Sequence, residues 1–191
     1  MSFLEKYDKE FAPKLATRAG TFRRIFEELE KKNKDFYTVV ETGCARIKGN
    51  FTGDGMSTVL FDAFINYYDG KVYSVDINDE HCKVARSLVS NKTEVICDNS
   101  LHFLAEFSEK QSIDLLYLDS FDIKFAKPHE SALHHLKEFV AVFASLQPGT
   151  VIAIDDNEKN PVSGKGMYVA EFLEDLGYEK FIDEYQIGWI L

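Results

Sequence analysis

Five short apolar runs, each closed by an acidic residue, constrain the fold of this chain more than any other feature. The runs lie at 36–40, 72–75, 93–97, 113–118 and 150–154, and the acids that close them are Glu41, Asp76, Asp98, Asp119 and the pair Asp155–Asp156. Segments with helical periodicity separate the runs, and this alternation is typical of a parallel sheet in an α/β protein. Such a sheet gathers the acids at one edge, where open α/β sheets bind ligands.

The two ends of the chain complete this pattern. The pattern of residues 1–32 predicts two helices that break at Gly20–Thr21, with Thr21 as the N-cap of the second. The last two apolar runs, 178–183 and 186–191, have so short a connection that they must pair antiparallel. Between them and the early strands, a long helix is expected to begin at Pro128.

We therefore expect an α/β fold with a single domain over residues 1–191. The domain would be a Rossmann-like three-layer sandwich, whose seven-stranded, mostly parallel sheet ends in an antiparallel C-terminal hairpin. Residues 35–191 would form the α/β core. Residues 1–34 would form a helical leader, which either covers the mouth of the binding site as a lid or packs on the outside of the sheet.

Composition argues against several classes of partner. The formal net charge is −10, from 22 basic and 32 acidic residues, and no dense basic run supplies the clustered cations that nucleic-acid binding requires. No apolar run approaches the roughly 20 residues of a membrane span, and the charged start is unlike a secretory signal. We therefore expect a cytoplasmic protein with no nucleic-acid or membrane partner. The sequence leaves open whether it forms a homo-oligomer.

The loop after the first apolar run indicates what kind of ligand the sheet edge binds. Gly43 is followed by an insert at 46–52 before Gly53–Asp54–Gly55, so the Gly-x-Gly-x-x-Gly turn of dinucleotide sites is absent. No Gly-Lys-Ser/Thr phosphate loop occurs either. A carboxylate in such a loop is wrong for a phosphate but suits an amine or a sulfonium. These features argue against a nucleotide triphosphatase and disfavour a nicotinamide enzyme.

An ordered set of motifs resembles the class I S-adenosylmethionine-dependent methyltransferases. The set consists of Val39–Cys44 with Gly55–Thr58, then Val72–Ile77, Cys97–Ser100, Asp114–Asp119 and Leu146–Thr150. Together with the terminal hairpin it spans nearly the whole chain beyond residue 35. The insert at 46–52 departs from the family, which usually turns directly into the helix there. By the resemblance, Glu41, Gly43 and Cys44 would line the methionine part of the cofactor, and the insert leaves open how that end is held.

The resemblance implies S-adenosylmethionine as the cofactor and gives its expected contacts. Asp76 would accept both ribose hydroxyls, Ile77 would pack on the adenine, and Asp98 with Asn99 would meet the adenine amino edge. The full set of implied cofactor residues is Glu41, Gly43, Cys44, Gly55, Ser57, Thr58, Asp76, Ile77, Asp98, Asn99, Ser100 and Asp119.

A second resemblance concerns a metal. Asp119 with Asp156 and Asn157 is similar to the metal-dependent catechol-type O-methyltransferases, in which an Asp and an Asp-Asn pair hold a divalent cation. Their oxygens suit Mg²⁺ or another divalent cation, which would bind the acceptor and lower the pKa of its hydroxyl. Alternatively these acids cap loops or orient substrate, and Asp155 offers a competing arrangement.

The catalytic base has several candidates. The catechol-type pattern places a lysine soon after the acid of the fourth strand, but Lys124 comes later than that pattern expects. His129 is the alternative, because it lies in the first turn of the long helix near the reactive edge. His134 is expected to point away from that helix's apolar stripe and His135 to lie at its flank. The catalytic candidates are therefore Asp119, Lys124 and His129.

These observations predict an S-adenosylmethionine-dependent methyltransferase that acts on a small-molecule acceptor. We expect it to be an O-methyltransferase, and a divalent metal is a candidate ligand at its acceptor site. The alternative is a non-catalytic domain on the same fold that binds the cofactor or has a regulatory role, because one fold can host several functions.

Overall fold

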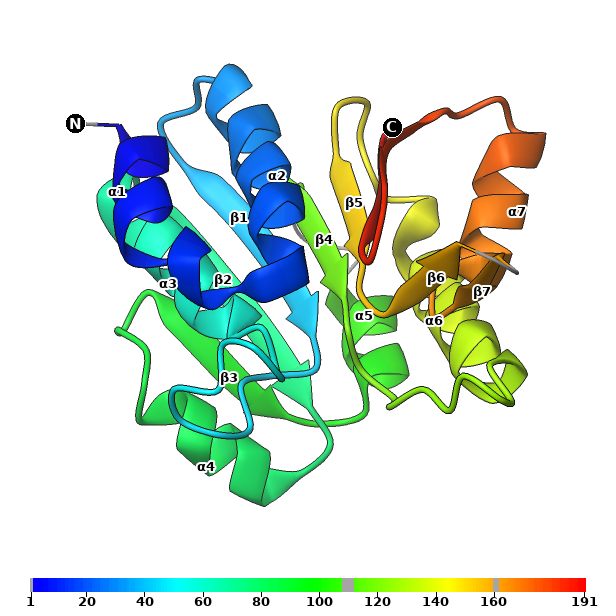
Figure 1. Cartoon of the computed structure of the whole chain (residues 1–191), viewed down its shortest axis with the longest axis horizontal. Coiled ribbons are helices and arrows are strands. Elements are labelled where there is room, and N and C mark those ends of the chain that lie inside the picture. Colours follow the sequence, from blue (N-terminus) through cyan, green and yellow to red (C-terminus); the bar gives the residue numbers. More distant parts are fainter. Residues whose placement is uncertain (1, 108–111, 160–161) are drawn as a thin grey trace.

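The computed structural model describes residues 2–107, 112–159 and 162–191 (Figure 1). Its helices are α1 Phe3–Glu10, α2 Ala19–Lys31, α3 Ser57–Tyr67, α4 Asp79–Arg86, α5 Ser100–Phe107, α6 His129–Phe143 and α7 Met167–Asp175, with short 3₁₀ turns at Ala12–Lys14 and Ala16–Arg18. Its strands are β1 Tyr37–Thr42, β2 Gly70–Asp76, β3 Thr93–Cys97, β4 Leu115–Leu118, β5 Val151–Ile154, β6 Asn157–Lys159, β7 Val162–Gly164, β8 Lys180–Asp183 and β9 Ile187–Ile190.

Seven of the strands form one sheet in the order β3-β2-β1-β4-β5-β9-β8. The pairs from β3 to β5 are parallel, whereas β9 pairs antiparallel with both β5 and β8. The predicted Rossmann-like sheet with an antiparallel C-terminal hairpin is therefore confirmed. The central strands β1, β4 and β5 are buried along their whole length, as expected for parallel strands covered on both faces.

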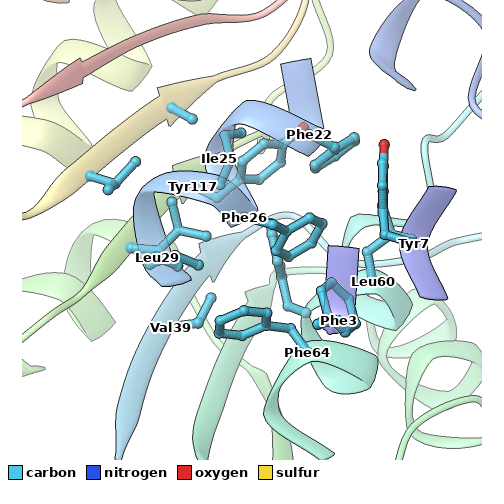
Figure 2. Close-up of a cluster of buried hydrophobic side chains, with 14 of the residues drawn as sticks. Phe3, Tyr7, Phe22, Ile25, Phe26, Leu29, Val39, Leu60, Phe64 and Tyr117 are labelled. Carbon is cyan, nitrogen blue, oxygen red and sulfur yellow. The ribbon is translucent and has the colours of Figure 1, made fainter. Parts of the chain in front are cut away.

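Helices cover both faces of the sheet. On one face α1, α2 and α3 pack against alternate residues of the strands, and Figure 2 shows the aromatic centre of this layer, with Phe3, Phe26 and Phe64 in contact. On the other face α5, α6 and α7 pack against the intervening residues, around Phe139 and Trp189. Because successive side chains of a strand point to opposite faces of the sheet, the same strands contribute residues to two apolar cores.

The N-terminal helices belong to the layer against the sheet, the second of the two predicted arrangements. In Figure 1, α1 and α2 (blue) lie over the sheet, and Phe22, Ile25 and Leu29 of α2 are fully buried in its core. The break between the helices lies in the 3₁₀ turns rather than at Gly20–Thr21. Thr21 therefore does not cap α2: it lies inside the helix, where its hydroxyl bonds the carbonyl of Arg18 and the side chain of Gln186.

One element was not predicted. Residues after β5, expected to form a polar loop to Gly166, contain the two-stranded antiparallel sheet of β6 and β7. Their short strands carry no apolar alternation, which is the pattern by which a half-buried strand is predicted. In the described ranges, no helix is long and apolar enough to cross a membrane.

Candidate functional site

The strand register brings the carboxyl-end residues together. Thr42 pairs with Val75 of β2 and with Leu118 of β4, and Leu118 pairs with Ile154 of β5. The next residues of these strands, including Gly43, Asp119 and Asp155, therefore meet at one edge. Gly43 has φ +81°, and a Cβ added there would lie 2.5 Å from the carbonyl oxygen of Asp119. Only glycine permits this turn and this close approach of β1 to β4.

A cavity of about 370 Å³ opens at this edge. Its lining comes from the predicted turns after β1, β2, β3, β4 and β5, and also from the N-terminal segment, the insert after β1 and the loop after β7. The lining residues are Arg18, Gly43, Cys44, Arg46, Gly53, Asp54, Ser57, Val75, Asp76, Ile77, Asn78, His81, Asn99, Ser100, Asp119, Ser120, Phe121, Asp122, His134, Asp156, Lys165 and Tyr185.

One end of the cavity is formed by the ends of β2 and β3. Asp76 is held in place by backbone N–H groups: that of Asn78 donates to Oδ1 at 2.8 Å and that of Cys44 to Oδ2 at 3.3 Å. Ile77 is 74% exposed although it is a large apolar residue at the cavity wall, and Asn99, the residue before α5, lines the same cavity. An anchored carboxylate beside an uncovered apolar side chain matches the chemistry of a ribose with its base.

Eight of the twelve predicted cofactor residues line this cavity: Gly43, Cys44, Ser57, Asp76, Ile77, Asn99, Ser100 and Asp119. The other four are placed elsewhere among the described residues. Gly55 packs on the side chain of Arg18, and Thr58 bonds Glu41 and the Ala45 backbone. Asp98 lies outside, with Oδ2 2.8 Å from Nδ1 of His102.

Glu41 lies beneath the cavity rather than in its wall. It is inside β1, fully buried, and its Oε2 accepts hydrogen bonds from Thr58 at 2.7 Å and from Ser74 at 2.5 Å. Its other oxygen, Oε1, is buried with no hydrogen-bond partner in the described part of the chain. Burial raises the pKa of Glu41 to about 7, against the opposing effect of the hydroxyls of Ser57, Ser74 and Thr58.

At the other end of the cavity lies a cluster of three carboxylates and two cations, and all of them except the buried Asp155 line the cavity wall that the structure describes. One oxygen from each of Asp119, Asp155 and Asp156 lies within 4.8 Å of the others. Arg18 donates from Nε to both oxygens of Asp155, at 3.0 and 2.8 Å, and from Nη2 to Asp156 at 3.3 Å. Lys165 Nζ lies 2.5 Å from Asp119 Oδ1 and 2.9 Å from Asp156 Oδ2. The carboxylates are therefore neutralised largely by side chains of the chain itself.

The protonation of this cluster follows from burial and charge. Burial lowers the pKa of Lys165, but the adjacent Asp119 and Asp156 raise it more, and the net shift is upward. Burial raises the pKa of Asp119, and although Lys165 lowers it, the neighbouring Asp155 and Asp156 raise it further. Lys165 is therefore held as a cation between carboxylates that repel one another.

The predicted metal ligands do not fit a divalent cation in this arrangement. Asp119 and Asp156 do lie together, but the ammonium of Lys165 bonds both, where the ion would have to bind. Asn157 is buried, its amide group donates to the carbonyls of Ile154 and Asp155, and its oxygen accepts from the Gly166 N–H at 3.1 Å. A divalent ion would have to displace these groups.

Two of the predicted catalytic residues are not brought to the cavity. Lys124 is exposed in the loop before α6, and His129 contacts the hydroxyl of Tyr168 at 2.7 Å, on the side of α6 next to α7. Neither lines the cavity within the described ranges. Of the three catalytic candidates, Asp119 alone is at the site.

Two further histidines follow His129 on α6. His134 points away from the apolar stripe, as predicted, and this side is the cavity wall, where it stacks on Phe121 with ring centroids 5.3 Å apart. Its Nε2 lies 3.2 Å from Oε1 of the buried Glu138, which also accepts from Ser120 at 2.7 Å. His135 is fully buried, and burial lowers its pKa to about 4. His134 therefore belongs to the site and His135 to the core.

Arg18 and Lys165 are functional-site residues that the sequence did not reveal. Arg18 lies 23 positions before Glu41 in a segment expected to be helical, and Lys165 lies in an expected loop. A basic residue in either place is ordinarily solvated. The one available signal was the acidic edge itself, since clustered carboxylates need cationic partners.

Comparisons with known proteins agree with this arrangement. Residues 51–157, more than half of the chain, match the family model described as a methyltransferase domain. None of the curated proteins compared with the chain matches it significantly.

Solved structures share the fold at low sequence identity. The MycE methyltransferase from the mycinamycin biosynthetic pathway, solved in complex with Mg and SAH, superposes with a TM-score of 0.64 at 18% identity over 91% of this chain and 49% of MycE. This chain thus spans about half the length of MycE. CalS11, a calicheamicin methyltransferase, gives a TM-score of 0.63 at 11% identity over 89% of this chain and 77% of its own. The O-methyltransferase NovP gives 0.57 at 13% identity, over 91% and 79%.

The family model, the strand order and the position of the cavity lead to the same assignment. The chain belongs to the methyltransferase-domain family, and it shares the Rossmann-like fold of solved methyltransferases.

Proposed function

We propose that this protein transfers a methyl group from S-adenosylmethionine to an oxygen of a small-molecule acceptor. The observation that carries the proposal is a single cavity with two chemically different ends. An anchored Asp76 and an uncovered Ile77 form one end, and Asp119 with Lys165 forms the other. A nucleoside suits the first end, and a polar acceptor suits the second.

The nucleoside half of the cofactor is assigned to the end formed by β2 and β3. Asp76 would accept both ribose hydroxyls, since its two oxygens can each take a further hydrogen bond. Ile77 would be covered by the adenine, and this would explain why so large an apolar side chain lies open at the wall. Asn99 would meet the polar edge of the base.

The methionine half is assigned to the insert that departs from the family pattern. Asp54, in the glycine turn directly after this insert, lines the cavity with a side chain only 10% exposed, and its Oδ2 is buried without a hydrogen-bond partner in the described ranges. Arg46 lies 3.3 Å from the other oxygen of Asp54. An ammonium group would satisfy Asp54. The guanidinium of Arg46, which donates to both oxygens of the exposed Asp122 at 2.9 Å, would exchange Asp122 for the carboxylate of methionine. The pair therefore complements the zwitterion of methionine.

The acceptor end is assigned to Asp119. Its carboxylate is at the end of β4, faces the cavity and is fixed by Lys165. In the proposed step the acceptor oxygen attacks the methyl carbon, a C–O bond forms, and the C–S bond breaks with its electron pair remaining on sulfur. The hydroxyl proton of the acceptor passes to Asp119. The chain itself contributes mainly by holding the reactants in line and excluding water.

Oxygen is proposed as the acceptor atom because NovP, one of the structures sharing the fold, is described as an O-methyltransferase. A cytoplasmic location, a small-molecule partner rather than a nucleic acid or membrane, and homo-oligomer formation stay predictions.

Transfer of a labelled methyl group tests the proposal against a non-catalytic role. The purified chain, supplied with methyl-labelled S-adenosylmethionine and a panel of small hydroxylated compounds, is expected to label at least one of them. The D119N variant should lose most of that activity while still binding S-adenosylhomocysteine. Cofactor binding without transfer to any acceptor in the panel would favour the alternative of a regulatory or cofactor-binding domain.

A further inference from the structure

The ammonium of Lys165 lies at the centre of the acidic end of the cavity. Lys165 precedes α7, and its side chain is 1% exposed. Its Nζ bonds Asp119 Oδ1 at 2.5 Å and Asp156 Oδ2 at 2.9 Å, and it lies 3.4 Å from the carbonyl oxygen of Asp119. Lys165 thus joins the end of β4 to the residues after β5, as a shared cation would.

The guanidinium of Arg18 neutralises the remaining side of the cluster. It bonds both oxygens of Asp155, reaches Asp156 and the carbonyl of Thr52, and stacks on the ring of Tyr185 with 4.7 Å between Cζ and the ring centroid. In their charged forms, three carboxylates against two cations leave one net negative charge. A divalent ion added to this set would repel both cations at short range.

A metal would also need the oxygens that Lys165 now occupies. Mg²⁺ binds oxygen at about 2.0–2.1 Å with near-octahedral geometry, so an ion bridging Asp119 and Asp156 would have to expel the ammonium. The expelled side chain would leave a buried position in which it is paired with two carboxylates, and breaking a buried ion pair of this kind is costly.

We propose that Lys165 takes the position of a divalent cation at the acceptor site, so that this methyltransferase holds Asp119 and Asp156 in place without a metal. Lys165 is then a positioning residue. Lys165 would affect methyl transfer through Asp119, and this part of the proposal rests on the proposed function. The part in which Lys165 takes the place of a metal does not depend on the proposed function.

Titration with Mn²⁺, followed by the electron paramagnetic resonance signal of the free ion, tests the proposal without cofactor or acceptor. The wild-type chain is expected to bind no Mn²⁺ at millimolar concentration. K165S removes the ammonium and leaves space beside the carboxylates, so it should gain Mn²⁺ affinity by roughly tenfold or more. K165M is the matched control, because it removes the charge but fills the space, and D119N in the K165S background should abolish the gain.

Stoichiometric Mn²⁺ binding by the wild type that D119N abolishes would overturn the proposal, and this measurement needs no variant of Lys165. A K165S variant that folds, as judged by circular dichroism, but gains no Mn²⁺ affinity would also overturn it. Neither Mn²⁺ titration involves S-adenosylmethionine. An overturned role of Lys165 is therefore distinguishable from an overturned function, which would show as a wild-type chain that does not bind S-adenosylhomocysteine.

Discussion

Arg18 and Asp155, which are 137 positions apart in the sequence, form a buried ion pair in which Nε donates to both carboxylate oxygens at 3.0 and 2.8 Å. The pair joins the segment before α2 to the end of β5, and both side chains are almost inaccessible. It ties the N-terminal layer to the reactive edge of the sheet. The N-terminal helices are therefore part of the site's framework and not a separate lid.

Replacing Arg18 by methionine should destabilise the protein strongly. R18M leaves Asp155 buried without its cation, and removing one partner of a buried pair costs about 3–5 kcal/mol. Urea denaturation measures the free energy of unfolding. R23M is the matched control, since Arg23 pairs with Asp8 at the surface, where such a pair is worth at most about 1 kcal/mol. The double variant R18M/D155N should recover part of the loss, and equal effects of R18M and R23M would contradict the assignment.

The stability of the protein should depend on pH through Glu41. Its pKa is raised from 4.5 to about 7 in the folded state, so between these values the folded chain binds more protons than the unfolded chain. The free energy of unfolding therefore falls as the pH rises through this window, by about 3 kcal/mol at most from this one group.

The E41Q variant removes this titration. The stability of E41Q relative to wild type should rise as the pH increases from about 5 to about 8, when unfolding free energies are measured across that range. E94Q, which removes the half-exposed carboxylate of Glu94 on β3, is the control and should change stability by less than about 1 kcal/mol. A difference between E41Q and wild type that stays constant with pH would show that Glu41 is ionised throughout.

The exposed side chain of Ile77 provides a test of the adenine site. I77S should weaken the binding of S-adenosylhomocysteine by roughly tenfold, because burying part of an isoleucine under the base is worth about 1–2 kcal/mol. Leu176 is also exposed, at 54%, and it does not line the cavity in the described structure, so L176S is the matched control. Equal affinities of I77S and wild type in calorimetry would place the adenine elsewhere.

Periodicity and strand-end chemistry were enough to predict the sheet and the edge where the site lies. The apolar runs before Asp76 and Asp119 became buried parallel strands, and their register placed both acids at one cavity. The strand closed by Glu41 runs one residue further than expected, and this turns its carboxylate into the core instead of the cavity.

What could not be predicted was which distant side chains reach the edge. Arg18 and Lys165 lie outside every motif, and only tertiary packing brings them to Asp155 and Asp119. His129 was expected at the site because the first turn of α6 lies near the edge, but its ring is directed to Tyr168 on α7, while His134, one and a half turns later, lines the cavity. Helical periodicity predicts on which face of a helix a residue lies, but it does not predict which other element packs against that face.

Calorimetric titration of the full chain with S-adenosylhomocysteine tests the central claim most directly. The wild-type chain is expected to show one-site binding that D76A weakens by roughly 100-fold or more, since two hydrogen bonds to a charged acceptor are lost, each worth about 1.5–3 kcal/mol. D79A, which removes a nearby exposed carboxylate paired with Lys83, should leave the affinity unchanged. Absence of binding to the wild-type chain, or binding that D76A does not alter, would contradict the assignment of the cavity as the cofactor site.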